Sequence, residues 1–256
     1  MKFSLSFFDK IQDNIYVLKK DHWDYSGIED FQITCVSHVK ENPKDILLIF
    51  CNHNHCFTLG RGLQKISTEK NIDLIDFQED TPLNYPLYKL KRGGGLTFHY
   101  PGQIVFYPIL NLTHHHVNVY DLMISILRMT KKSLEALFGI EGLEVDTTLL
   151  GLWKKSNLEN KKVASIGLAV TRFITYHGLA LNLFFDENIF NELKNVHPCG
   201  LPGNTYSSIE EILLRPISKE EESWILDNLQ KLFIEFIQHQ SMVDKKLSSF
   251  STNVEF

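Results

Sequence analysis

The sequence predicts a single domain of mixed α+β (α/β) class, with grouped strands and helices set around them. The composition is ordinary for a globular protein, since 43% of the 256 residues are hydrophobic and 22% are charged. No internal repeat, low-complexity tract or Pro/Gly/Ser-rich linker divides the chain. Segments with helical spacing occur beside short apolar runs typical of buried strands. We therefore expect one domain over residues 1–240 and a polar, loose tail over 241–256.

Three segments have the apolar spacing of a helix. Ile28, Phe31, Cys35 and Val39 share one face and predict a helix over residues 24–40. Residues 118–138 predict a long amphipathic helix that ends at Gly139. Its inward residues are Leu122, Met123, Ile126, Leu127, Leu134 and Leu137. Residues 218–221 read Ser-Lys-Glu-Glu, a capping box for a last helix. The apolar face of that helix includes Trp224, Leu229, Leu232, Phe233 and Phe236.

Four segments are predicted to be strands. Residues 45–50 form a short, wholly apolar run after Asp45, as expected of a strand buried on both faces. Further strands are expected at residues 151–153, 162–168 and 176–183.

Several classes of protein are disfavoured by composition. The longest apolar run, Ile46 to Cys51, is far shorter than the roughly 20 residues of a membrane-spanning helix. The amino terminus becomes charged too early for a secretory signal. Four cysteines in a chain of this size do not form a disulfide framework. We expect a cytoplasmic protein that does not bind membranes.

Basic residues are concentrated in two segments, although the net charge is −5. Residues 89–103 carry a net +3 and residues 154–177 a net +4, which leaves −12 for the remainder. This distribution favours an anionic partner at one place over a nucleic acid bound across the surface. Lysines that merely flank loops remain the alternative interpretation.

The most unusual stretch is Arg92 followed by Gly93, Gly94 and Gly95. Consecutive glycines are costly in backbone entropy, so they indicate close approach of a ligand or positive φ angles. Arg92 before them and His99 after them could hold an anionic or carbonyl-bearing ligand. The spacing fits neither the phosphate loop nor the dinucleotide fingerprint. A tight turn with nothing bound stays open.

Cys199 lies between Pro198 and Gly200, which would fix the thiol on a rigid turn and suit it to act as a nucleophile. An inert core cysteine is the alternative. A nucleophilic thiol needs a nearby cation or base, and the candidates are Lys162, His99 and His177. Lys162 could also be an ordinary solvated lysine at the start of a strand.

Two histidine-containing clusters have residue types that could bind a metal. Residues 51, 53 and 55 would share one face of a strand, but no second Cys/His pair stands at a suitable spacing for zinc. His114, His115 and His116 are interpreted as polar surface residues. We predict no metal site.

Four motifs, taken together and in order, resemble the lipoyl(octanoyl) transferase family of lipoate biosynthesis. They are Arg-Gly-Gly with Thr-aromatic-His-x-Pro-Gly-Gln (92–103), Lys-x-Ala-x-x-Gly (162–167), His-Gly-Leu-Ala-Leu-Asn (177–182) and Pro-Cys-Gly (198–200). Weaker similarities include Tyr25 with Gln32, and His53 with residues 58–61. The match runs from about Tyr25 to Ile212.

The resemblance implies a fold of the biotin/lipoate protein ligase type and a defined set of site residues. Cys199 would be the nucleophile that carries the acyl group as a thioester. Lys162 would lower the pKa of the thiol and act as general acid/base. The substrate-binding residues would be Arg92, Gly93, Gly94, Gly95, Leu96, Thr97, Phe98, His99, Ser165, Ile166, Gly167, His177, Gly178, Leu179 and Ala180. No cofactor is implied.

The resemblance also implies the partners. Octanoyl-acyl carrier protein would be the donor, and lipoyl domains of 2-oxoacid dehydrogenase E2 subunits and the glycine cleavage H protein would be acceptors. An ATP-dependent lipoate or biotin ligase, an octanoyl amidotransferase and a non-catalytic acyl-carrier-binding protein remain alternatives. Tyr100 departs from the glycine usual at that position, and the loop 154–161 is longer than usual. We expect Tyr100 to narrow or reshape the mouth of the pocket.

Overall fold

A computed structural model describes residues 3–61, 83–193, 196, 198 and 201–251. The large sheet contains β1 (Asp9–Gln12), β2 (Ile15–Trp23), β3 (Ile46–His53), β7 (Gln103–Ile109), β8 (Leu143–Asp146), β9 (Gly151–Lys154), β10 (Lys161–Thr171) and β11 (Ile174–Asn182). The small sheet contains β4 (Cys56–Leu59), β5 (Leu87–Lys89) and β6 (Leu96–His99). The helices are α1 (Ile28–Glu41), α2 (Val119–Phe138), α3 (Glu187–Glu192), α4 (Ile209–Leu213) and α5 (Lys219–Ser251). Short 3-10 turns occupy Leu5–Phe7 and Gly203–Thr205.

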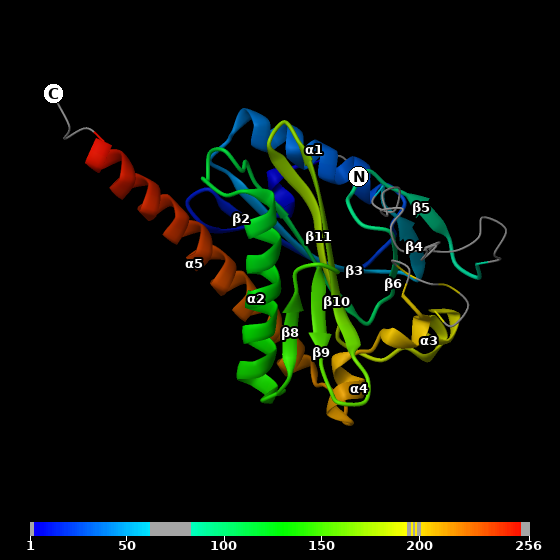
Figure 1. Cartoon of the computed structure of the whole chain (residues 1–256). Helices are drawn as coiled ribbons and strands as arrows, with labels where there is room; N and C mark the ends of the chain where they lie inside the picture. The colour runs from blue at the N-terminus through cyan, green and yellow to red at the C-terminus, as the bar shows by residue number, and fades with distance from the viewer. Residues whose placement is uncertain (1–2, 62–82, 194–195, 197, 199–200, 252–256) are drawn as a thin grey trace, which may run out of the picture.

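The large sheet has the strand order β1-β2-β3-β7-β11-β10-β9-β8, and the small sheet has the order β5-β4-β6. Within the large sheet β2 and β3 are parallel and the other neighbours are antiparallel. Both sheets are therefore mixed, and helices flank them in Figure 1. The predicted α+β class is confirmed.

Both faces of the large sheet are covered, and β3 illustrates why. Leu48 and Phe50 pack with the core beneath α2 and α5, whereas Leu47 and Ile49 pack with the core beneath α1. Successive side chains of a strand point to opposite faces, so a strand covered on both sides must be apolar throughout. A third cluster, which includes Phe57, joins the small sheet to α3.

The predicted helices form, with ends set by their capping residues. The Asn118 side chain accepts from the backbone N–H of Asp121 at 2.8 Å, and Gly139 ends α2 with φ 64°. Ser218 accepts from the N–H of Glu221, which in turn accepts from the N–H of Ser218, so the capping box is confirmed. α1 begins at Ile28 rather than at the predicted residue 24, because its N-cap residue is Gly27 with φ 91°.

One expectation about the last helix is wrong. Trp224 is 39% exposed, and Ile225 occupies the buried position beside it. The backbone of α5 runs to Ser251 and extends past the sheet in Figure 1.

Two long strands were missed. β2 carries lysines at its exposed end, and β7 lies at the centre of the sheet with all seven residues buried. β7 includes Pro108 and follows the turn after Tyr100. Proline and nearby glycine weaken a strand signal in the sequence.

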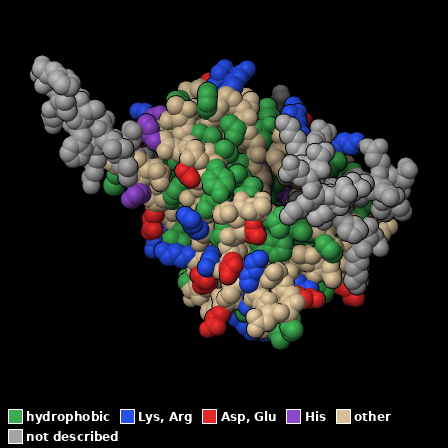
Figure 2. All heavy atoms as spheres, viewed as in Figure 1, with side chains coloured by type: hydrophobic (Ala, Val, Ile, Leu, Met, Phe, Trp, Pro, Cys, Tyr) green, Lys and Arg blue, Asp and Glu red, His purple; other side chains and the backbone are tan. Residues whose placement is uncertain are grey.

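Charged side chains of both signs are interspersed on the face seen in Figure 2, with apolar side chains between them. Within the described residues, no helix combines the length and hydropathy needed to cross a membrane.

Candidate active site

A cavity lies between the large sheet and the small sheet, and four strands supply most of its wall. β7 contributes Val105 and Tyr107, and β6 contributes Thr97 and His99. β10 contributes Lys162, Ser165, Ile166 and Gly167, and β11 contributes His177, Gly178, Leu179 and Ala180. Tyr25, Arg92, Leu149 and Leu150 complete the lining. Segments far apart in sequence therefore meet at one place.

Lys162 is almost fully buried, with 2% of the residue exposed. Its Nζ donates to the carbonyl oxygen of Leu149 at 3.1 Å and lies 5.6 Å from the centroid of the Trp153 ring. Gly151 makes room for this side chain, because a Cβ there would lie 2.5 Å from the Cε of Lys162. A buried ammonium is costly unless partners hold it, so this placement is specific.

Backbone contacts fix Lys162 against the segment that follows Pro198. Its carbonyl oxygen accepts from the N–H of Ser207 at 3.1 Å, and its backbone forms a parallel bridge with Tyr206. The Tyr206 hydroxyl donates to the carbonyl oxygen of Pro198 at 2.7 Å. Pro198 and Tyr206 are thus tied to the start of β10.

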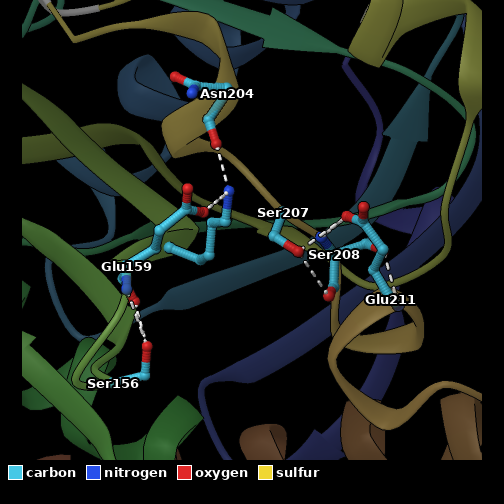
Figure 3. A network of polar contacts seen from close by, with 7 residues as sticks. Ser156, Glu159, Asn204, Ser207, Ser208 and Glu211 are labelled. Carbon is cyan, nitrogen blue, oxygen red and sulfur yellow. Dashed lines mark hydrogen bonds and ion pairs between the residues drawn. The ribbon is translucent and has the colours of Figure 1, made fainter.

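The neighbouring Lys161 points the other way and holds the surrounding loops. Its Nζ donates to the carbonyl oxygen of Asn204 at 2.7 Å and forms an ion pair with Glu159. Ser156 bonds both backbone groups of Glu159, and Ser207 donates to Glu211 at 2.8 Å (Figure 3). These contacts fold the long 154–161 loop onto the segment that carries Asn204.

The glycine-rich segment packs closely on β10. The N–H of Gly93 donates to the carbonyl oxygen of Leu168 at 3.2 Å, and a Cβ on Gly167 would lie 2.9 Å from the oxygen of Gly93. Gly167 is paired directly with Gly178, whose own Cβ would lie 2.1 Å from the oxygen of Phe106. Glycine is needed at these positions because backbone approaches backbone.

A buried chain of hydrogen bonds fixes the roof of the cavity. Arg92 Nη2 donates to both oxygens of Thr58, at 2.9 Å to the carbonyl and 2.8 Å to Oγ1. The ring of His99 donates from Nδ1 to Gln103 Oε1 at 3.0 Å and accepts from Thr58 Oγ1 at Nε2. Gln103 donates in turn to Asn182 Oδ1 at 2.9 Å. Burial, with His53 and Arg92 nearby, holds the pKa of His99 well below its ordinary value, so the ring is neutral.

His53 lies behind this wall in the same neutral form. Its Nδ1 donates to the carbonyl oxygen of Trp23 at 2.8 Å, and its Nε2 accepts from the Tyr107 hydroxyl at 2.9 Å. Burial lowers the pKa of His53 to about 4. The Tyr25 ring stacks on His99 and meets His53 edge-on. The ring nitrogens of His53 are thus bound within the protein.

His177 has an unusual backbone and is buried, with 1% exposed. Its φ is 60°, in the left-handed region that favours glycine. The backbone N–H donates to Gln32 Oε1 at 2.6 Å, and Nε2 lies 3.8 Å from Glu29 Oε1. Burial lowers the pKa of His177, and Glu29 opposes that shift.

The structure brings most of the predicted site residues to this cavity. Its lining includes Arg92, Thr97, His99, Lys162, Ser165, Ile166, Gly167, His177, Gly178, Leu179 and Ala180. Gly93 donates to β10, Gly94 is exposed and Gly95 is buried, and Leu96 and Phe98 pack in the third core cluster. Cys199 lies outside the described residues.

Other residues of the wall were missed by the sequence reasoning. Val105 and Tyr107 are alternate residues of β7 and therefore face the same side of the sheet. This pattern would have pointed to them if the strand had been predicted. Leu149 and Leu150 precede β9 and carry no recognisable signal.

Two interpretations of single residues are corrected. Tyr100 is fully buried, donates to the carbonyl oxygen of Phe184 at 2.8 Å and does not line the cavity. Its ring packs over Gly102 in the third cluster, so it cannot narrow the mouth. His115 is buried rather than a surface residue, and burial lowers its pKa to about 4.

The geometry can be compared with known proteins. Residues 28–225 match the family model of the lipoyl protein ligase A/B catalytic domain. The chain belongs to this family.

Relatives in the lipoyl protein ligase A/B family are octanoyltransferases. The chain is 33% identical to that of Cytophaga hutchinsonii over 189 residues, covering 73% of each protein. It is 30% identical to that of Christiangramia forsetii over 231 residues, covering 86% of this chain and 94% of the relative. A chloroplastic octanoyltransferase of Arabidopsis thaliana is 30% identical over 210 residues, which cover 81% of this chain and 66% of that protein. The prediction of an octanoyltransferase-type enzyme is confirmed at this level.

Two solved structures support the fold. P. falciparum LipL1 in complex with lipoate has a TM-score of 0.55 at 16% identity, covering 88% of this chain and 61% of that one. Lipoate-protein ligase A bound with ATP has a TM-score of 0.55 at 14% identity, covering 88% and 85%. At these identities the similarity concerns the fold alone.

Proposed function

We propose that this protein transfers an octanoyl group from acyl carrier protein to a lysine of lipoyl domains, through a thioester on Cys199. The placement of Lys162 supports this most strongly, because a buried amine in the lining of a cavity to which three of the four motifs contribute is suited to proton transfer. The octanoyltransferases among its relatives support the choice of acyl group. The 2-oxoacid dehydrogenase E2 subunits and the glycine cleavage H protein are the proposed acceptors.

The position of Cys199 in the chain supports its role as the nucleophile. Cys199 follows Pro198, whose carbonyl is bonded to Tyr206, and Tyr206 is bridged to Lys162. An ammonium near a thiol favours the thiolate, which is the nucleophilic form. The proposed pairing of Cys199 with Lys162 follows from this connection.

In the first proposed step the Cys199 thiolate attacks the carbonyl carbon of the octanoyl thioester. The bond between that carbon and the carrier's sulfur then breaks, and Lys162 donates a proton to the departing thiolate. The octanoyl group is left on Cys199, and the carrier leaves as a thiol.

In the second step the neutral amine of the acceptor lysine attacks the same carbon. The bond to the Cys199 sulfur breaks and an amide forms. The amine proton passes to Lys162, which restores the ammonium, and Cys199 returns to the thiolate. One carrier must leave before the other binds, so the kinetics are expected to be ping-pong.

Intact-protein mass spectrometry tests the proposal directly. The protein is incubated with octanoyl-acyl carrier protein without ATP, beside the variant Cys199→Ala. A hydroxylamine-sensitive gain of one octanoyl group in the wild type alone is expected. Modification of a lipoyl domain that requires ATP and free octanoic acid would instead indicate a ligase. Transfer of the octanoyl group from one octanoylated protein to another, with no use of the carrier, would indicate an amidotransferase. A protein that binds octanoyl-carrier without any transfer would be a binding protein.

A further inference from the structure

The loop that joins β8 to β9, residues 147–150, supplies a carbonyl that holds Lys162. The carbonyl oxygen of Leu149 accepts from Lys162 Nζ at 3.1 Å. Leu149 and Leu150 also contribute to the lining of the cavity. The conformation of this loop therefore affects both the position of the buried amine and a part of the cavity wall.

Asp146 closes this loop with its side chain. It is the last residue of β8 and is paired with Gly151, the first residue of β9. Its Oδ1 accepts from the backbone N–H of Thr148 at 2.9 Å and from that of Leu149 at 2.8 Å. An aspartate that accepts from the backbone two residues further on stabilises a turn. Leu149 is thus held by Asp146 through its N–H and bonded to Lys162 through its carbonyl.

The backbone of Leu150 is strained in a way that bears on the same carbonyl. Its φ is 39°, in the left-handed region that is unfavourable for a residue with a Cβ. Rotation about the N–Cα bond of Leu150 sets the direction of the peptide group that it shares with Leu149. The φ of Leu150 therefore fixes where the Leu149 carbonyl points. Such strain persists only where the surrounding contacts impose it, and the bonds to Asp146 and Lys162 are contacts of this kind.

The carboxyl group of Asp146 is ionised at neutral pH. The hydrogen bond from Leu149 lowers its pKa most, and Thr148, Lys155 and Lys162 act in the same direction against the smaller effect of burial. Hydrogen bonds from a backbone N–H to an ionised carboxylate are stronger than those to a neutral acceptor. Asp146 is therefore able to hold the loop firmly.

We propose that Asp146 is a positioning residue for Lys162: its carboxylate holds the loop 147–150 so that the Leu149 carbonyl keeps the amine in place for proton transfer. The inference rests on the proposed function, which assigns that proton transfer to Lys162. Asp146 is not among the described residues that line the cavity, so it acts through the backbone of Leu149 and not on the substrate. A small displacement of a catalytic group slows a reaction strongly, which is why such a support matters.

The test measures two properties of Asp146→Ala, which lacks the oxygen that accepts from both N–H groups. Single-turnover octanoyl transfer is expected to be at least about tenfold slower, because the amine is no longer held in place. The second measurement is the rate at which acetic anhydride modifies Lys162, relative to the exposed Lys44, by peptide mass spectrometry. This relative rate is expected to rise at least about fivefold, because the hydrogen bond that holds the amine is weakened.

Two further variants separate the turn from other effects of the substitution. Asp146→Asn keeps a side-chain oxygen for the same two N–H groups, and asparagine favours the same turn, so both rates should stay within about threefold of the wild type. Glu144→Ala is the matched control, because Glu144 is an exposed acidic residue two positions earlier on β8 and on the same face of the strand. It should retain both wild-type rates.

Urea unfolding establishes that each variant is folded under the conditions of the assay. A merely structural role would lower the unfolding midpoint of Asp146→Ala and leave both rates of the folded protein unchanged. That result would overturn the proposal, as would an Asp146→Asn variant that transfers as slowly as Asp146→Ala.

Failure of the proposed function is distinguishable from failure of the positioning role. If the wild type forms no adduct with octanoyl-acyl carrier protein, the reaction assignment fails. The modification of Lys162 by acetic anhydride does not depend on octanoyl transfer and still tests the loop. Faster modification in Asp146→Ala but not in Asp146→Asn would support the role of Asp146, and equal modification in the wild type and Asp146→Ala would overturn it.

Discussion

Lys162 and His177 are both buried, polar residues that line the cavity, yet they are held in opposite ways. Lys162 lies at a register shift between β10 and β9 and donates to the carbonyl oxygen of Leu149, with Gly151 making space for its side chain. His177 has a left-handed backbone, and its ring nitrogens lack hydrogen-bond partners among the described residues, although Glu29 Oε1 lies 3.8 Å from Nε2.

This difference separates two uses of a buried polar group. A cation held by a carbonyl and an aromatic ring keeps a defined position, as proton transfer requires. Neutral groups whose hydrogen-bonding capacity is unused can instead recognise what reaches them. The same sheet thus supplies a positioned amine and a histidine whose hydrogen-bonding capacity is unused.

The largest expected effect on octanoyl transfer is from substitution of Lys162. Lys162→Ala should slow octanoyl transfer by about 10²–10⁴-fold, the usual contribution of a general acid/base. Single-turnover transfer, followed by mass spectrometry, measures this. Lys161→Ala is the matched control, because the adjacent side chain points outward to Asn204, and it should change the rate by less than about twofold. Equal rates for wild type and Lys162→Ala would remove Lys162 from the mechanism.

A second change alters the space around that amine without removing it. In Gly151→Ala the new Cβ would lie 2.5 Å from Lys162 Cε and 2.6 Å from the Ala164 oxygen. We expect a loss of about 1–3 kcal/mol in the free energy of unfolding and transfer at least about tenfold slower. Gly139→Asn, where nothing lies within 4 Å of the Cβ, should change both quantities little. Normal transfer by Gly151→Ala would show that Lys162 tolerates displacement.

The histidine-rich wall makes a smaller prediction, on stability against pH. Burial lowers the pKa of His53 to about 4, so the unfolded chain binds its proton more readily. The stabilisation is complete above about pH 6.5 and is lost as the pH falls toward 4. One such site contributes up to about 1.4 kcal/mol per pH unit. Urea unfolding between pH 7 and 4.5 should show a shallower pH dependence for His53→Asn than for wild type, and identical slopes would contradict this.

The smallest effect is expected at the start of α5, away from Lys162 and His177. Ser218→Ala removes the side chain that caps α5 and should lower the free energy of unfolding by about 1 kcal/mol. Octanoyl transfer should stay at the wild-type rate, measured in the same assay. A reduced rate would mean that transfer depends on the stability of α5. It would then be harder to attribute the slower transfer of the Lys162 and Gly151 variants to the cavity itself.

The sequence by itself determined the class of fold, most helices and the residues worth testing. Helix caps such as Asn118 and Ser218 act within a few residues, so their signals are local and readable. The glycine-rich segment and Lys162 are notable for their residue types, and four ordered motifs connected them to one family. Strand β7 was not predicted, because the strands that bury it are distant in the sequence.

Only the tertiary structure decided how these residues are used. Lys161 and Lys162 are adjacent and chemically identical, but strand alternation and Gly151 bury one and leave the other holding a surface loop. The left-handed φ of His177 depends on contacts with α1, over a hundred residues earlier. Tyr100 was expected at the mouth and instead fills a core. Burial and hydrogen bonding depend on long-range packing, which no local pattern encodes.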